Sequence, residues 1–115
     1  MLARAHRLTR GQDFSETVRR GRRSATSTVV LHLLDVDGSD VEPRVGMVVS
    51  KQVGNAVTRN QVKRRLRHLL RDRVDQLARG AMLVVRVSPA AGSATSRLLG
   101  RDLDRALGRL TGARG

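Results

Sequence analysis

Between Lys51 and Arg71 the chain carries seven basic residues and no acidic one, and this stretch constrains the fold more than any other. Apolar residues recur through it at the spacing of an amphipathic helix, which we expect over 56–78. At about 100° per residue, the apolar side chains fill one arc of the helix and the basic ones fill the arc beside it. One face should pack on a core while its neighbour presents a row of cations. The polar arc comprises Arg59, Asn60, Lys63, Arg64, Arg67 and Arg71.

A row of this kind destabilises a helix unless something negative lies against it. Like charges four residues apart cost roughly a few tenths of a kcal/mol per pair, and Arg59/Lys63 and Lys63/Arg67 are two such pairs. A ribose-phosphate backbone would reverse this cost by neutralisation and counterion release. The alternative is a solvated basic face, but the missing acidic residues favour nucleic acid. Arg65 lies on the other side of the helix and is expected to be an ordinary surface residue.

The start of this helix carries a second signal for a polyanion. Gly54 permits a tight turn, Asn55 can cap the helix, and the free N–H groups of a first helical turn favour phosphate. Asn60 is a weak helix former among charges. Its amide can donate to and accept from a sugar hydroxyl, a phosphate or a base edge.

The overall charge points the same way. The net charge of +13, from 23 Lys plus Arg against 10 Asp plus Glu, favours a polyanionic partner, with nucleic acid the commonest and an anionic membrane surface the rival. No run approaches the roughly 18 apolar residues of a membrane-spanning helix. Residues 1–10 lack the apolar segment of a secretory signal, and the absence of cysteine excludes disulfides. We expect a cytoplasmic protein forming a single domain over 1–115.

The other elements follow from their periodicities and turn residues. We expect the strands over 28–34 and 44–50 to pair as a hairpin. The order helix, strand, strand, helix, strand, helix predicts a two-layer α/β domain with helices packed on one sheet. The remaining expected elements are a basic extended arm over 1–10, a helix over 13–20, an acidic loop over 35–43, a strand over 81–87 and a helix over 94–110.

The sequence gives no sign of a catalytic site in the protein itself. His6, His32 and His68 lack metal-ligand spacing, and no carboxylate pairs with any of them in a recognisable motif. No strand–turn–nucleophile signature frames a serine or threonine. We therefore expect no catalytic residue, no metal site, no cofactor held by the protein and no small-molecule substrate.

One motif is specific enough to indicate a family. The series Arg59-Asn60-x-x-Lys63-Arg64-x-x-Arg67, preceded by Val-Gly-Asn-Ala-Val at 53–57, closely resembles the RNR signature of the bacterial ribonuclease P protein family. Weaker matches follow in order over nearly the whole chain: Arg7-Leu8, Asp13-Phe14, Gly21-Arg22, Arg44-Val45-Gly46, Val49-Ser50-Lys51, and the strand at 82–87 ending near Pro89.

The resemblance implies a fold, an activity and partners. The fold is a ribosomal-protein-like α/β (α+β) two-layer sandwich, with one mixed sheet of about four strands and a left-handed crossover through the RNR helix. The activity is that of a subunit of the ribonuclease P holoenzyme, which removes the 5′ leader of precursor tRNA. The active site is in the RNA, which requires Mg²⁺. The partners are that catalytic RNA and the precursor tRNA 5′ leader, with no membrane.

The resemblance also assigns residues. Contacts to the catalytic RNA fall to Lys51, Asn55, Arg59, Asn60, Lys63, Arg64, Arg67 and Arg71. The leader cleft falls to Phe14, Val18, His32 and Arg86. Val18 and His32 stand where the family often has aromatic residues, so Phe14 is the single aromatic residue of the chain.

Three of the cleft assignments have plain structural alternatives. Phe14 could be a core residue of the first helix, His32 a strand histidine with an ordinary hydrogen bond, and Arg86 a residue at a sheet edge. For the whole chain, the alternative function is a ribosomal or other structural RNA-binding scaffold. A DNA-binding helix-turn-helix is disfavoured because the basic helix follows a strand. Membrane binding is disfavoured because the apolar arc is needed to cover the sheet.

Overall fold

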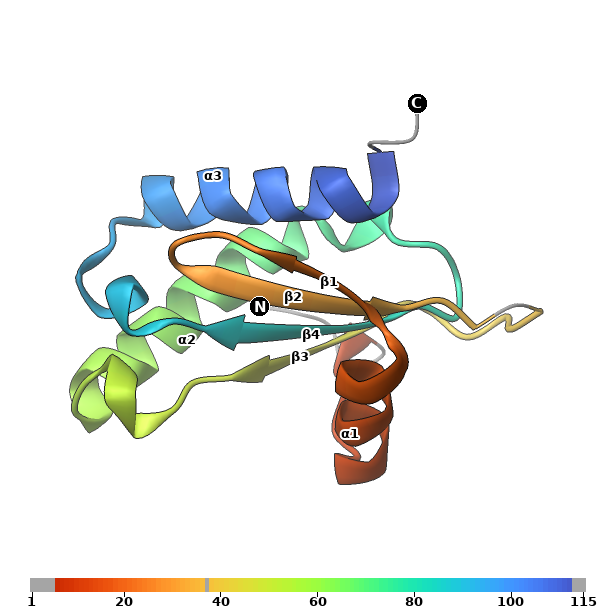
Figure 1. The fold of residues 1–115 in the computed structure, drawn as a ribbon, viewed down its shortest axis with the longest axis horizontal. Coiled ribbons are helices and arrows are strands. Elements are labelled where there is room, and N and C mark those ends of the chain that lie inside the picture. The colour runs from red at the N-terminus through yellow and green to blue at the C-terminus, as the bar shows by residue number, and fades with distance from the viewer. Residues whose placement is uncertain (1–5, 37, 113–115) are drawn as a thin grey trace.

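The computed structural model describes residues 6–36 and 38–112, in which three long helices pack on one sheet (Figure 1). The four strands lie in the order β1-β2-β4-β3, with β3 and β4 parallel and the other pairs antiparallel. The predicted two-layer α/β class with a mixed sheet is therefore confirmed. The elements are α1 (Gly11–Arg20), β1 (Arg22–Ala25), β2 (Val29–Leu34), β3 (Arg44–Val48), α2 (Ala56–Arg71), β4 (Met82–Val87) and α3 (Ser96–Leu107).

The predicted hairpin between residues 28–34 and 44–50 is wrong. β2 pairs instead with β1, a short edge strand that the sequence did not reveal, and β4 lies between β2 and β3. The reason lies in β4, where Met82, Leu83, Val84 and Val85 are all almost fully buried. A continuous apolar run buries both of its faces, which requires a central place in the sheet.

The crossover from β3 to β4 has the uncommon hand. In Figure 1 both strands point the same way and α2 passes behind the sheet, which makes the β3–α2–β4 connection left-handed. Right-handed connections are the strong rule for parallel strands.

The bounds of two helices differ from the prediction, and one tertiary contact lies at the end of α2. α2 ends at Arg71 rather than at residue 78, and a 3-10 turn over Val74–Gln76 follows it. Arg73 donates to the Leu69 carbonyl at 2.8 Å and, through Nε, to Asp104 of α3 at 2.7 Å. It thereby satisfies a terminal carbonyl of α2 and ties that helix end to α3. The last helix begins at Ser96 and continues past Leu107 as a π-turn over Gly108–Gly112.

The sheet is covered unequally on its two faces. Its back face packs against α2 and α3 around fully buried residues such as Leu31, Leu66 and Leu103. In the described chain its front face carries α1 and the segment before it, where Phe14 packs on a small cluster of Leu8, Met82 and Val84. A Cβ at Gly46 would overlap the Phe14 ring, so glycine lets the ring lie directly on β3.

A buried histidine lies on the front side of β2. His32 is 4% exposed and points away from Leu31 and Leu33, which face the back core. Neither ring nitrogen has a hydrogen-bond partner within the described part of the chain. Burial first, and then the charges of Arg86 and Arg23, lower the pKa of His32 below its ordinary value of 6.5.

This burial predicts a pH-dependent stability. Below about pH 6.5 the unfolded chain takes up a proton that folded His32 resists, so the free energy of unfolding should fall as the pH drops. The slope contributed by one such proton is at most about 1.4 kcal/mol per pH unit. Urea unfolding at pH 7.5 and 5.5 measures it. His32→Phe should flatten this dependence, whereas the control His68→Gln, at an exposed position, should leave it unchanged. Equal slopes in wild type and His32→Phe would contradict the assignment.

Candidate nucleic-acid interface

The start of α2 is built as the sequence predicts. The Asn55 side chain accepts a hydrogen bond from the Thr58 backbone N–H at 2.9 Å, which confirms the expected helix cap. Gly54 has a φ of +155°, and a Cβ there would come within 2.9 Å of Thr58. Glycine is thus required for the chain to turn from the short helix at Lys51–Val53 into α2. Because the cap uses the Asn55 oxygen, its amide N–H₂ is left for a ligand.

α2 separates its apolar and basic residues as the wheel predicts. Val62, Leu66 and Leu70 are at most 1% exposed and face the back core. The adjoining arc, which we call the α2 ridge, comprises Arg59, Asn60, Lys63, Arg64, Arg67 and Arg71. Of these six, Asn60, Arg64 and Arg71 are exposed and the other three are half-buried.

The α2 ridge is almost without ion pairs. Within residues 6–36 and 38–112, its single carboxylate contact is Arg71 to Asp72 at 3.7 Å, between two well-exposed side chains. Such a pair is weak. The Nε of Arg59 is buried and has no partner among the described residues. A buried N–H donor without an acceptor costs free energy, and a bound hydrogen-bond acceptor would remove that cost.

Apart from Asp72, the acidic residues that form ion pairs or side-chain hydrogen bonds in the described chain lie away from the α2 ridge. Asp102, buried in α3, accepts from Thr28 at 2.6 Å. In the acidic loop, Asp35 pairs with Arg22 at 2.9 Å, and Glu42 pairs with Arg79 at 3.4 Å. Figure 1 shows this loop projecting from the end of the sheet opposite the start of α2. These carboxylates of the acidic loop are thus neutralised by arginines at that end of the sheet, away from the start of α2.

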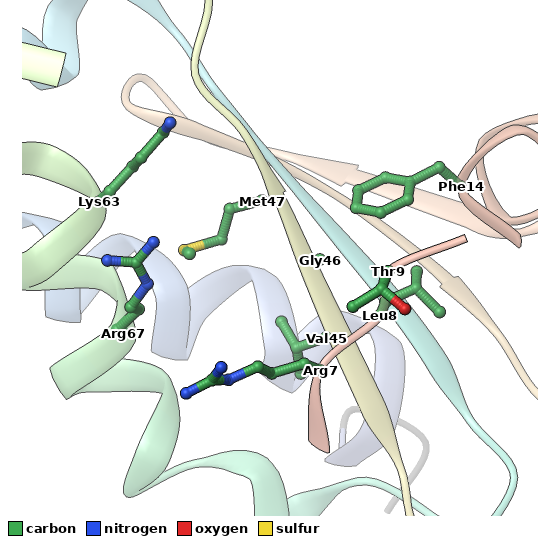
Figure 2. A pocket seen from close by; sticks show the side chains of 9 residues that line it. All are labelled: Arg7, Leu8, Thr9, Phe14, Val45, Gly46, Met47, Lys63 and Arg67. Atoms are coloured by element: carbon green, nitrogen blue, oxygen red, sulfur yellow. The ribbon is translucent and has the colours of Figure 1, made fainter. Parts of the chain in front are cut away.

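A hollow of about 360 Å³ joins the α2 ridge to the open edge of β3 (Figure 2). Lys63 and Arg67 approach it from α2, and Phe14 lies on the other side of β3. The basic arm predicted over 1–10 lies partly outside the described residues, but its described end reaches this hollow. The Leu8 N–H donates to the Val45 carbonyl at 2.9 Å, so the chain at Arg7 forms a parallel bridge with Val45 along the outer edge of β3.

A second hollow, of about 400 Å³, brings together three of the four predicted cleft residues. Phe14, Val18 and Arg86 line it, together with Ser15, Arg19 and Val48. Arg86 is the exposed residue of the otherwise buried central strand β4, which excludes the sheet-edge alternative. Phe14 lines both hollows and also packs on the front cluster, so it is a core residue and a surface residue at once.

His32 takes a different place from its expected partners. It does not line the second hollow but is buried in the same face of the sheet, opposite Arg23 on β1 and diagonal to Arg86 on β4. The alternative of an ordinary hydrogen bond finds no partner among the described residues either.

The structure corrects one assignment and adds others. Arg65 is not an ordinary surface residue: it is half-buried and donates to the Ala94 carbonyl at 2.9 Å, which holds the segment before α3 against α2. Arg7 and Arg19 line the two hollows, although sequence reasoning did not select them. Arg19 carries a local signal, because it lies one helical turn after Ser15 on the face of α1 that borders the hollow.

The described residues hold neither a membrane-spanning helix nor a cluster of metal ligands. No described helix is both long enough and apolar enough to cross a membrane. The same residues contain no group of three or more histidine and carboxylate side chains placed to hold a metal ion.

Comparison with known proteins identifies the family. The sequence profile of the family Ribonuclease P matches residues 2–111. The ribonuclease P protein component of a Nocardioides species is 54% identical over 111 residues, covering 96% of this chain and 95% of that protein. That of Streptomyces griseus is 52% identical over 119 residues, covering 97% of each.

Solved structures show the same fold. The Staphylococcus aureus RNase P protein superposes with a TM-score of 0.81 at 24% identity, covering 92% of this chain and 97% of that one. The Thermotoga maritima protein gives a TM-score of 0.73 at 24% identity, covering 91% and 94%. With a family profile over nearly the whole chain and relatives about half identical along their full length, the chain belongs to the ribonuclease P protein family.

Proposed function

We propose that this chain binds the catalytic RNA of ribonuclease P through the α2 ridge and the 5′ leader of precursor tRNA through the front face of the sheet. As a member of its family, the chain is a subunit of the ribonuclease P holoenzyme, which processes tRNA 5′ ends. The observation that carries the RNA-binding proposal is the α2 ridge, which has almost no carboxylate partner in the described chain. The scaffold alternative is not favoured, because the curated relatives are ribonuclease P protein components.

The charge and exposure of the α2 ridge and the residues before it support the contact to the catalytic RNA. Lys51, Asn55, Asn60, Arg64 and Arg71 are exposed, and Arg59, Lys63 and Arg67 are half-buried with their helix face turned to solvent. Forked guanidinium groups suit phosphate, and each neutralised phosphate releases condensed counterions.

The residues that line the second hollow support the leader contact. Phe14 offers one ring for stacking on a base, which is worth roughly 1–3 kcal/mol. Val18 and Val48, 37% and 40% exposed, offer apolar surface for further bases, and Arg19 and Arg86 supply charge for the backbone. Beneath this surface, burial and then the positive charges of Arg86 and Arg23 lower the pKa of His32. A polyanion bound near the two arginines offsets the second of these causes.

The protein's part in the reaction is to hold substrate rather than to cut it. Magnesium ions bound by the RNA supply the phosphodiester hydrolysis. The protein positions the leader relative to the RNA and offsets the repulsion between two polyanions, which raises substrate affinity. We place the chain in the cytoplasm, where its RNA partner and precursor tRNAs are made.

A reconstitution tests the whole proposal. The protein is mixed with Nocardioides ribonuclease P RNA at low magnesium, with precursor tRNA carrying or lacking a single-stranded leader. Cleavage should be stimulated, and affinity should be about five-fold or more higher for the substrate with a leader, as one stacked base implies. Phe14→Leu should reduce that leader-dependent gain. Binding of the RNA without stimulated cleavage would instead support a scaffold role.

The α2 ridge makes a separate prediction about salt. A variant with Lys63→Gln, Arg64→Gln and Arg67→Gln should bind the RNA with a log–log salt slope about 2 to 3 smaller than wild type, because each lost phosphate contact removes roughly 0.7–0.9. The control removes three arginines that are ion-paired elsewhere: Arg20→Gln, Arg22→Gln and Arg79→Gln. A wild-type slope in the ridge variant, or the same loss in the control, would refute contact through α2.

A further inference from the structure

A second row of unpaired cations lies on α3. Arg97, Arg101 and Arg105 stand at four-residue intervals, so they follow one side of the helix about 6 Å apart. All three are exposed, and none has an ion pair or hydrogen bond within residues 6–36 and 38–112. We call these three residues the α3 row.

The contacts of α3 show which way the α3 row faces. Leu99 and Leu103 are fully buried against the back of the sheet. On one flank of the helix, Gly100 lies against Leu69 of α2 and Arg73 just beyond its end. On the other flank, Asp102 accepts a hydrogen bond from Thr28 of the β1–β2 turn. The α3 row occupies the remaining side, which points away from the sheet. Figure 1 shows α3 along the top of the molecule.

Among the described residues, no acidic side chain forms an ion pair with the α3 row. The two carboxylates of α3 are already engaged: Asp102 is buried on Thr28, and Asp104 is held by Arg73 at 2.7 Å. Arg97/Arg101 and Arg101/Arg105 are therefore like-charged pairs four residues apart, and each destabilises the free helix. The same arrangement distinguishes the α2 ridge.

A single groove separates the two cationic surfaces. Arg64 of the α2 ridge, together with His68, borders a groove of about 190 Å³ whose other wall is Ser96, the first residue of α3. Arg97 follows directly. The Arg65 bond to the Ala94 carbonyl fixes this junction, since it ties the start of α3 to the middle of α2. A polyanion lying on the α2 ridge reaches the α3 row by crossing this one groove, whose lining also includes Arg65 and Leu69.

We propose that the RNA-binding surface continues across this groove, and that the α3 row binds a second stretch of ribose-phosphate backbone. The proposal rests on the proposed function, because it takes the α2 ridge as the first contact. Arginine suits this ligand, since its planar guanidinium can make forked bonds to phosphate. An anionic membrane fits less well, because a helix lying in a membrane surface must offer an apolar face, and that of α3 is buried under the sheet.

The test is the salt dependence of binding to the Nocardioides ribonuclease P RNA, with the protein as a full chain. The variant Arg97→Gln, Arg101→Gln, Arg105→Gln should lose about 2 to 3 from the log–log slope and at least about tenfold in affinity at 50 mM salt. The charge-preserving variant with lysine at all three positions should keep the wild-type slope. Circular dichroism and thermal unfolding establish that each variant is folded.

Two comparisons make the outcome decisive. The control variant at Arg20, Arg22 and Arg79 removes the same charge from ion-paired sites; if it loses as much slope, the α3 row acts only through net charge and the inference is overturned. If the α2 variant loses slope while the α3 variant keeps it, the inference fails and the proposed function stands. If neither variant loses slope, both fail.

Discussion

The packing of α2 on the back of the sheet is the constraint on which the rest of the structure depends. Burying an aliphatic side chain such as Val62, Leu66 or Leu70 stabilises the fold by roughly 1.5–3 kcal/mol. Repulsion within the α2 ridge costs only roughly 0.2–0.5 kcal/mol per pair. The free energy gained by burying the apolar arc therefore exceeds the cost of repulsion. The packing of α2 holds the cations in a row that an isolated helix would not favour. The fold thus stores an electrostatic cost that a polyanion can relieve.

The placement of the acidic residues leaves the α2 ridge with one weak carboxylate contact in the described chain, Arg71 to Asp72. Asp104 closes the end of α2 through Arg73, and Asp102 anchors the β1–β2 turn to α3. Asp35 and Glu42 neutralise arginines at the far end of the sheet. This explains the acidic loop, for which the sequence alone suggested only a solvated turn. The carboxylate contacts thus lie where one element meets another. The arginines on the helices that we assign to RNA are left mostly without carboxylate partners.

Local chemistry was predictable from the sequence, and long-range arrangement was not. The Asn55 cap and the two arcs of α2 depend on residues within a few turns of each other, and the structure has both. The pairing of β2 was mispredicted because strand order is set by the whole sheet. β4 needs two buried faces, and its apolar run was the signal that could have placed it in the centre. The early end of α2 depends on Arg73 reaching Asp104, more than thirty residues away.

The α2 account is tested most directly by the variant Lys63→Glu, measured for stability and for RNA binding. A glutamate here stands four residues from both Arg59 and Arg67, which turns two repulsive pairs into two attractive ones. The free energy of unfolding of the free protein should rise by roughly 1 kcal/mol, while affinity for the catalytic RNA falls at least about tenfold. A variant that loses stability, or that binds RNA as wild type does, would contradict the account.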